Sequence, residues 1–416
     1  MMKEEIASNL DDPKQLEKLY RDNKTTFKRA FNLMYPDIKD KPAAQFWNER
    51  LNFENEEISW GMNKELIFTI IAVFIAGLLA EIPNFAKIAP EYFYPRNIAF
   101  IVFPLMSAYF LWVQKIQSKK IIATVLFIFL LSALYINLLP NNSESHTLIL
   151  ACIHLPLFLW TVLGFSFISD NLKNYRHRLD FLRFNGDLIV MTTIILIAGA
   201  MLTGITIGLF TLIDINIEEL YLQHIVVCGL AASPIVGMFL VQTNPHLVNR
   251  VSPVIAKVFT PLVLVTLVVY LLAVIGTGKN PYSDRDFLIV FNLLLVGVMV
   301  IIFFSIAETS KKSGTIIGTL LLFALSIVTV IVNGVALSAI LYRISEWGIT
   351  PNKLAVLGSN ILIMNNLFII AYRLFKALKD RSQIEYVEKS IACFLPVYGL
   401  WAFLVTFIFP LLFNFK

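Results

Sequence analysis

The sequence predicts an all-α, polytopic transmembrane helix bundle preceded by a small helical segment, and three observations carry that prediction. Hydrophobic side chains make up 57% of the 416 residues and charged side chains only 15%, far from the balance of soluble domains. The charge is uneven, because residues 1–63 hold 22 of the 63 charged side chains. Beyond them, apolar residues fall into runs of about 20, the length of a membrane-crossing helix.

Residues 1–63 are predicted to form a cytoplasmic, amphipathic helical head. Apolar side chains from Leu16 to Met34 recur at three- and four-residue spacing behind Asp12 and Pro13, which suits a helix start. A second short helix is expected over 43–53. Because so short a segment buries little apolar surface, we expect these faces to dock on cytoplasmic loops, to lie in the lipid interface or to bind a protein partner.

Residues 64–413 are predicted to form the transmembrane domain, with eleven spans. The predicted spans are 65–82, 97–113, 121–139, 147–169, 187–210, 222–242, 254–276, 287–306, 315–341, 352–372 and 391–413. If the amino terminus is cytoplasmic, sixteen Lys and Arg side chains flank the inner ends and seven the outer ends. Because short cytoplasmic loops are enriched in these residues, this bias predicts an inside amino terminus and an outside carboxyl terminus. Before the fifth span, Asp170 and Gly186 are predicted to begin and end a separate interfacial helix.

Several functional classes find no support in the sequence. A net charge of +5 without a basic block gives no sign of a nucleic-acid partner. Cys152, Cys228 and Cys393 lie in apolar runs without metal-ligand spacing, so we expect no metal and no cofactor. No phosphate-binding loop or hydrolase motif is present, which weighs against an enzyme without excluding one.

Ionisable side chains are scarce at membrane depth, where they usually mark function. Glu81, Asp187, Asp214 and Glu308 fall at predicted span ends, where snorkelling or water suffices. His154 is the one titratable group predicted at mid-depth, either as a hydrogen-bonded packing residue or as a proton or ligand site. This pattern weighs against a proton pump.

Uncharged amides are the more informative polar groups. Asn333 and Asn360 lie at equal sequence distance on either side of a predicted hairpin turn, so they fall at the same depth. Further amides are expected on these helices or the preceding one: Asn292, Asn365 and Asn366. Two interpretations stay open, namely interhelical hydrogen bonding and the polar lining of a substrate cavity.

A helix breaker offers a second candidate for a substrate site. Ser233 and Pro234 lie in an Ala, Ser, Pro and Gly stretch over 231–237 of the sixth predicted span. Such a stretch can unwind a helix, and broken helices in transporters expose backbone groups to substrates or ions. Proline is also ordinary in membrane helices, so the signal is weak.

The turn between the ninth and tenth predicted spans carries a family resemblance. Gly348 suits a helix end, and Thr350 suits the cap of the next helix. With Arg343, Trp347 and Asn352, this segment resembles a motif of a bacterial polytopic membrane family catalogued as domain of unknown function 4153. The resemblance covers about 180–413 and implies an architecture and a bacterial inner membrane, but no reaction.

The function predicted most directly is a transporter or flippase-like carrier for an uncharged polar or lipidic substrate. The alternative is a non-transporting scaffold or sensor that docks a cytoplasmic partner through the head and the basic loops. A membrane enzyme is third, because paired acids and histidines are missing. Besides the lipid bilayer and this possible cytoplasmic protein, no partner is indicated, and the oligomeric state is open.

Overall fold

The computed structural model describes residues 2–10, 12–22, 27, 30–31, 34–35, 38–52, 63–116, 118–142, 144–168, 174–211, 215–244, 259–269, 271–272, 282, 285–309 and 316–415. All regular elements in these ranges are helices, which confirms the predicted all-α class. The chain divides into two compact units, Met1–Ser59 and Trp60–Lys416, and each is described by itself.

The first unit contains α1 (Met2–Ser8), α2 (Pro13–Asp22) and α4 (Pro42–Asn52). Asp12 caps α2, since its Oδ1 accepts the backbone N–H of Lys14 at 3.0 Å. The apolar faces pack against one another around Leu16, Phe27 and Trp47, all buried. The head therefore has a core of its own, and its docking on loops, on lipid or on a partner stays a prediction.

Aromatic side chains explain how so short a segment builds a core. The Trp47 ring lies 5.1 Å from the Phe27 ring and 5.5 Å from the Tyr20 ring, measured between centroids. Arg50 covers the indole at 4.7 Å and pairs with Glu17 at 2.9 Å. Each buried aromatic removes about 150–250 Å² from water, so a few of them offset a small residue count.

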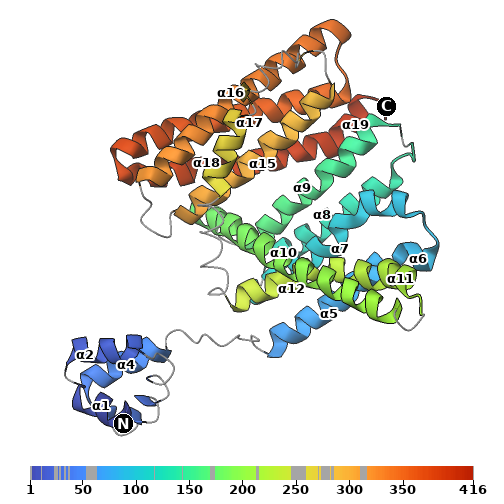
Figure 1. Cartoon of the computed structure of the whole chain (residues 1–416). Coiled ribbons are helices and arrows are strands. Elements are labelled where there is room, and N and C mark those ends of the chain that lie inside the picture. Colours follow the sequence, from blue (N-terminus) through green and yellow to red (C-terminus); the bar gives the residue numbers. More distant parts are fainter. Residues whose placement is uncertain are drawn as a thin grey trace. The chain divides into compact units, whose positions relative to one another are not determined.

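The second unit is built from long apolar helices (Figure 1). Their bounds are α5 (Asn63–Ala80), α6 (Ile82–Ala86), α7 (Pro90–Val113), α8 (Lys119–Leu138), α9 (His146–Ile168), α10 (Tyr175–Thr211), α11 (Glu218–Leu220), the π-helix η2 (Tyr221–Val226), α12 (Val227–Thr243), α15 (Arg285–Thr309), α16 (Ile316–Trp347), α17 (Pro351–Lys379), the 3₁₀-helix η3 (Arg381–Gln383), α18 (Ile384–Phe403), the π-helix η4 (Leu404–Ile408) and α19 (Phe409–Leu412).

Eight helical segments in the described ranges are long and apolar enough to cross a membrane. They are Pro90–Val113, Lys119–Leu138, His146–Ile168, Tyr175–Gly208, Glu218–Thr243, Ile316–Trp347, Pro351–Lys379 and Ile384–Leu412. The other predicted spans correspond to α5, which has 18 residues, to the apolar helix Phe259–Val269 and to the apolar stretch Phe291–Ala307 within α15. Multiple membrane crossings are thus confirmed, whereas eleven remains a prediction.

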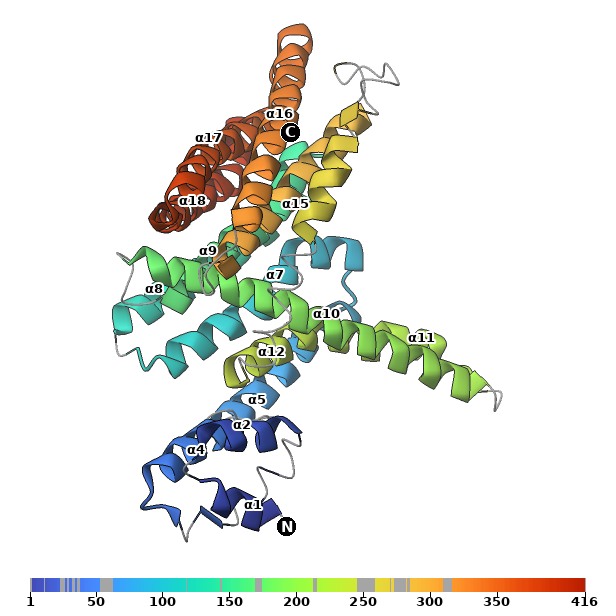
Figure 2. The ribbon, with the colours of Figure 1, turned by 60° about the vertical axis from the view of Figure 1, so that its left-hand side comes forward.

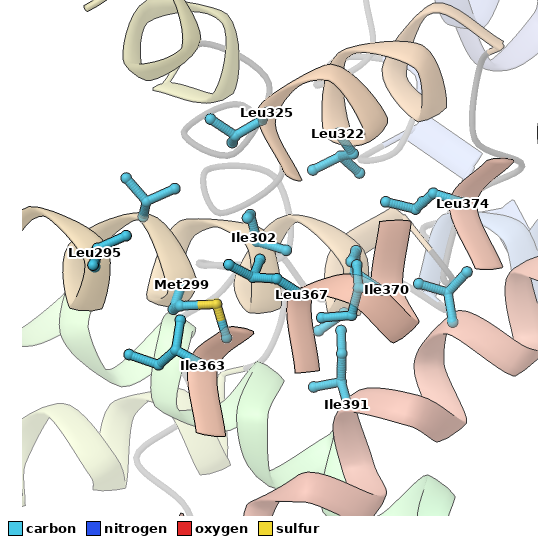
Figure 3. Packing of buried hydrophobic residues seen from close by; sticks show 14 of the residues in the cluster. Leu295, Met299, Ile302, Leu322, Leu325, Ile363, Leu367, Ile370, Leu374 and Ile391 are labelled. Carbon is cyan, nitrogen blue, oxygen red and sulfur yellow. The ribbon is translucent and has the colours of Figure 1, made fainter. Parts of the chain in front are cut away.

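The largest hydrophobic core lies where α15, α16, α17 and α18 pack side by side (Figure 3). Ile302, Leu325, Leu367, Ile370 and Ile391 meet there and are buried. A second core joins α5, α7, α10 and α12, and a third joins α7, α8 and α9. Many large apolar side chains on the outer helix faces stay exposed, as expected of a protein whose solvent is lipid.

α10 is one continuous helix of 37 residues, so the predicted helix end at Gly186 is wrong. The glycine allows α10 and α15 to pack closely, because a Cβ at Gly186 would overlap the Phe304 ring of α15. Asp170, the predicted cap, lies outside the described residues. From Ile194 to Phe210 the helix exposes most of its large apolar side chains, and Figure 2 shows α11 beside this half.

α12 is a regular α-helix through Ser233 and Pro234, so the predicted unwinding over 231–237 is also wrong. Its small residues allow a close crossing with α10, since a Cβ at Gly237 would lie 2.7 Å from Thr192 Oγ1. The departure from α geometry occurs instead at η2, which directly precedes α12. Segments of π-helix are often found at functional sites.

Candidate functional site

A chain of side-chain amides joins α15, α16 and α17 at one end of the largest core. Asn333 Nδ2 donates to the backbone carbonyl of Asn360 at 3.0 Å, and Asn360 Nδ2 donates to Asn292 Oδ1 at 2.8 Å. Asn333 is 0% exposed and Asn360 is 2% exposed. The structure thus brings together the two residues that the hairpin register places at one depth. We call Asn292, Asn333 and Asn360 the amide chain.

Not every hydrogen-bonding group of the amide chain is used. Asn333 Oδ1 is buried and accepts no hydrogen bond. An amide oxygen left without a donor costs about 1–3 kcal/mol, so such groups are rare in folded cores. The oxygen can accept a hydrogen bond from a hydroxyl or amide group of a ligand.

The other predicted amides behave differently from each other. Asn366 is buried, and its Nδ2 donates to the Tyr398 hydroxyl of α18 at 2.9 Å, while its Oδ1 also lacks a donor. Asn365 is exposed on the outer face of α17. Adjacent residues on a helix point about 100° apart, so only one of the two can face the core.

Two remaining candidates make only local hydrogen bonds. His154 Nδ1 donates to the carbonyl of Leu150, one turn earlier in α9, at 2.9 Å. Ser233 Oγ donates to the carbonyl of Leu230 at 3.0 Å. Both geometries are those of packing residues within a helix, and neither residue is joined to the amide chain by these bonds.

The hairpin between α16 and α17 is closed as its sequence predicts. Gly348 ends α16 at φ +70°, and Thr350 Oγ1 accepts the backbone N–H of Lys353. Asn352 donates to His146 Nδ1 of α9 at 2.9 Å, which fixes the turn to a third helix. Arg343 lies over the Trp347 ring at 5.3 Å. These motif residues therefore hold the turn in place.

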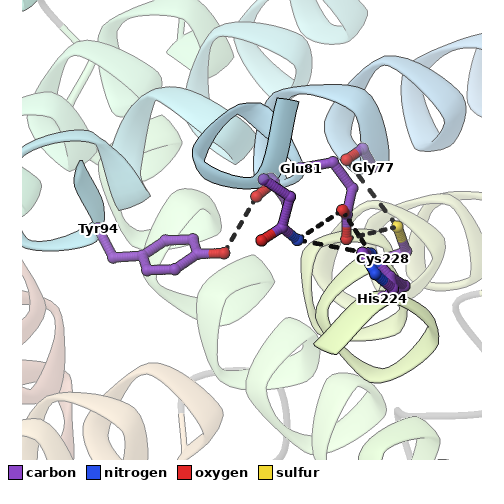
Figure 4. A network of polar contacts seen from close by, with 7 residues as sticks. Gly77, Glu81, Tyr94, His224 and Cys228 are labelled. Carbon is purple, nitrogen blue, oxygen red and sulfur yellow. Dashed lines mark hydrogen bonds and ion pairs between the residues drawn. The ribbon is translucent and has the colours of Figure 1, made fainter. Parts of the chain in front are cut away.

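A carboxylate–imidazole pair lies between α5 and η2, and the sequence did not reveal it (Figure 4). Glu81 is only 6% exposed, and its Oε2 accepts hydrogen bonds from His224 Nδ1 and Asn84 Nδ2, both at 2.8 Å. Cys228 Sγ lies 3.9 Å from Glu81 Oε1. The expectation that snorkelling or water solvates Glu81 is therefore wrong, because the carboxylate is buried and paired.

His224 lies in a π-helical segment. The residue lies in η2, where the wider π-helical turn sets the ring against the end of α5. Sequence reasoning missed the pair because 143 residues separate its members. A helix-end acid and a helix-start histidine carry no shared motif. Among the described residues, no group of three or more His, Cys, Asp or Glu side chains could hold a metal ion.

Comparison with known proteins adds no relative. No family model, curated protein or solved structure matches the chain. The helices themselves define its class, which is an integral, multi-pass membrane protein.

Proposed function

We propose that this protein is a transporter or flippase-like carrier for an uncharged polar or lipidic substrate. The observation that carries the proposal is the amide chain, which joins neutral hydrogen-bonding groups from three helices at the end of the largest apolar core. Its free acceptor, Asn333 Oδ1, suits a substrate hydroxyl or amide. The amide chain contains no charged side chain, and for this reason the proposal names an uncharged polar or lipidic substrate.

Transport is tested with the full chain in sealed proteoliposomes. One assay follows the movement of a fluorescent phospholipid from the inner to the outer leaflet, where added dithionite quenches it. The other follows the uptake of radiolabelled glycerol and glucose. We expect the wild type to be active in one assay and Asn333→Ala or Asn360→Ala to reduce its rate at least about tenfold, since a lost buried hydrogen bond to substrate is worth about 1–3 kcal/mol.

Asn365→Ala is the matched control, because it removes an exposed amide from the same helix. It should transport at the wild-type rate. Inactivity of the wild type in both assays, or full activity of the Asn333 and Asn360 variants, would contradict the proposal. Circular dichroism and gel filtration check that each variant is folded.

The location and the topology belong to the same proposal. We place the protein in a bacterial inner membrane with eleven spans, a cytoplasmic amino terminus and an outer carboxyl terminus. Membership of the domain of unknown function 4153 family is also a proposal, and it is supported by the hairpin motif from Arg343 to Asn352.

A second function is favoured by the head. A unit with its own core, Met1–Ser59, is what a scaffold or sensor needs in order to bind a cytoplasmic protein partner. On α4, Phe46 is 64% exposed beside the buried Trp47, so it offers an anchor that the fold does not require. Phe46→Ser should release a partner captured by the full chain and leave the head folded; an unchanged set of captured proteins would contradict the scaffold function.

A further inference from the structure

Arg96 is a buried arginine near the start of α7. It is 4% exposed, and its guanidinium lies 4.1 Å from the centroid of the Tyr92 ring. Nη1 donates to the Tyr92 carbonyl and Nη2 to Asn141 Oδ1, both at 3.2 Å. The side chain is always charged in proteins. All of these partners are neutral.

Within the described part of the chain, the charge of Arg96 has no counter-ion. Among the described residues, no ion pair within 4.0 Å includes it. Nε is buried and donates to nothing. Removing a charge from water is costly unless an opposite charge and hydrogen bonds compensate. The guanidinium therefore has a charge and a hydrogen-bond donor that no described side chain takes up.

The surroundings of Arg96 are rigid. Asn97 and Asn137 exchange two side-chain hydrogen bonds, at 3.0 and 2.8 Å, and so fasten α7 to α8. Tyr92 adds a bond from its hydroxyl to the Asn137 carbonyl at 3.0 Å. Because these contacts fix the helices on which the guanidinium and its neighbours lie, the site is preorganised.

One exposed side chain, that of Asn141, accepts a hydrogen bond from the guanidinium. Asn141 is exposed on the segment that follows α8, and its Oδ1 takes the place of a ligand oxygen on Nη2. Rotation of this one side chain would free Nη2 from its hydrogen bond to Asn141. An anionic oxygen binds a guanidinium more strongly than an amide oxygen does, so it can displace Asn141.

We propose that Arg96 binds the phosphate group of an anionic ligand. Its guanidinium fork matches phosphate geometry. Arg96 lies six residues into α7, about 9 Å from the helix start, which is close to the depth of lipid head groups. Ile98 and Leu138, each next to a residue of the Asn97–Asn137 pair, are exposed apolar side chains that suit an acyl chain. A membrane phospholipid and free phosphate share this chemistry.

Thermal unfolding of the full chain tests the proposal in maltoside detergent, which carries no phosphate. The probes are dioctanoyl phosphatidylglycerol, dioctanoylglycerol as its phosphate-free counterpart, and inorganic phosphate against chloride at equal ionic strength. A ligand that binds only the folded state raises the Tm with concentration. We expect phosphatidylglycerol to raise it and dioctanoylglycerol to leave it unchanged.

Variants assign the effect to Arg96. Arg96→Gln should weaken binding at least about tenfold, because charged hydrogen bonds are lost. Lys87→Gln, which removes an exposed cation near the start of α7, should bind as the wild type does. Asn141→Ala should bind more tightly, since no amide has to be displaced. If Arg96→Gln fails to fold, Asn141→Ala still tests the site.

The outcomes separate the two sources of phosphate. A response to the lipid alone identifies a phospholipid site, and a response to inorganic phosphate as well shows that the phosphate group suffices. The proposal would be overturned if dioctanoylglycerol raised the Tm as much as phosphatidylglycerol, or if neither phosphate probe raised it. It would also be overturned if the folded Arg96→Gln variant bound as tightly as the wild type, or if Asn141→Ala bound more weakly than the wild type.

Discussion

A methyl group at Gly358 would test the packing that supports the amide chain. Gly358 lies on α17 two residues before Asn360 and faces the Trp401 ring of α18. A Cβ at this position would overlap two carbons of the indole and lie 2.9 Å from a third, Cζ3. Carbon atoms in contact are ordinarily about 3.5–4.0 Å apart. Because the indole Nε1–H also donates to Ser359 Oγ at 2.9 Å, the ring cannot retreat freely.

The expected cost follows from these contacts. Overpacking a filled core costs about 1–3 kcal/mol, and a disturbed interhelical hydrogen bond in a membrane protein adds about 0.6 kcal/mol. Alanine is favoured over glycine in a helix by about 1 kcal/mol, which offsets part of the loss. Gly358→Ala should therefore lower the free energy of unfolding by about 0.6–2.6 kcal/mol.

The assay is reversible unfolding in mixed micelles of dodecyl maltoside and sodium dodecyl sulfate, followed by circular dichroism. Gly297→Ala on α15 is the matched control, because a Cβ there meets nothing within 4 Å. It should be neutral or stabilising. In a Trp401→Leu background the Gly358→Ala cost should shrink, since the clashing ring is gone. Equal stability of Gly358→Ala and Gly297→Ala, or an undiminished cost in that background, would refute the reasoning.

Two further predictions concern the Glu81–His224 pair and the core of the head. Glu81→Gln keeps an acceptor for His224 and should destabilise the full chain less than Glu81→Leu, which leaves His224 and Asn84 without one; thermal unfolding ranks the two, and the reverse order would contradict the hydrogen-bonded pair. A Met1–Ser59 fragment should fold alone, and Trp47→Ala should unfold it, since losing a buried tryptophan costs about 3–5 kcal/mol; circular dichroism of both fragments decides, and an unchanged spectrum would contradict the core.

Sequence reasoning located elements better than it located their ends or their contacts. Apolar runs predicted α7, α8, α9 and α16 because lipid demands long apolar helices with internally bonded backbones. The hairpin turn was predicted from Gly348 and Thr350, whose roles are local. Gly186 was misread because a glycine that ends a helix and one that admits a neighbouring ring look the same in a sequence.

The candidate site was predictable in part for the same reason. Asn333 and Asn360 are related by the symmetry of a hairpin, so sequence distance gives their depth. The burial of Asn366 and the exposure of Asn365 depend on helix rotation, which tertiary packing sets. The pairing of Glu81 with His224 depends on the crossing of α5 and η2, and no local pattern encodes it.

The uninterrupted α10 is longer than the apolar layer of a bilayer is thick. At 1.5 Å per residue its 37 residues measure about 55 Å, nearly twice the apolar thickness of a bilayer. Arg178 and Arg183 fasten its first turns to the carbonyls of Ala392 and Ala307. Along the membrane normal, about 25 Å of the helix would therefore lie outside the apolar layer.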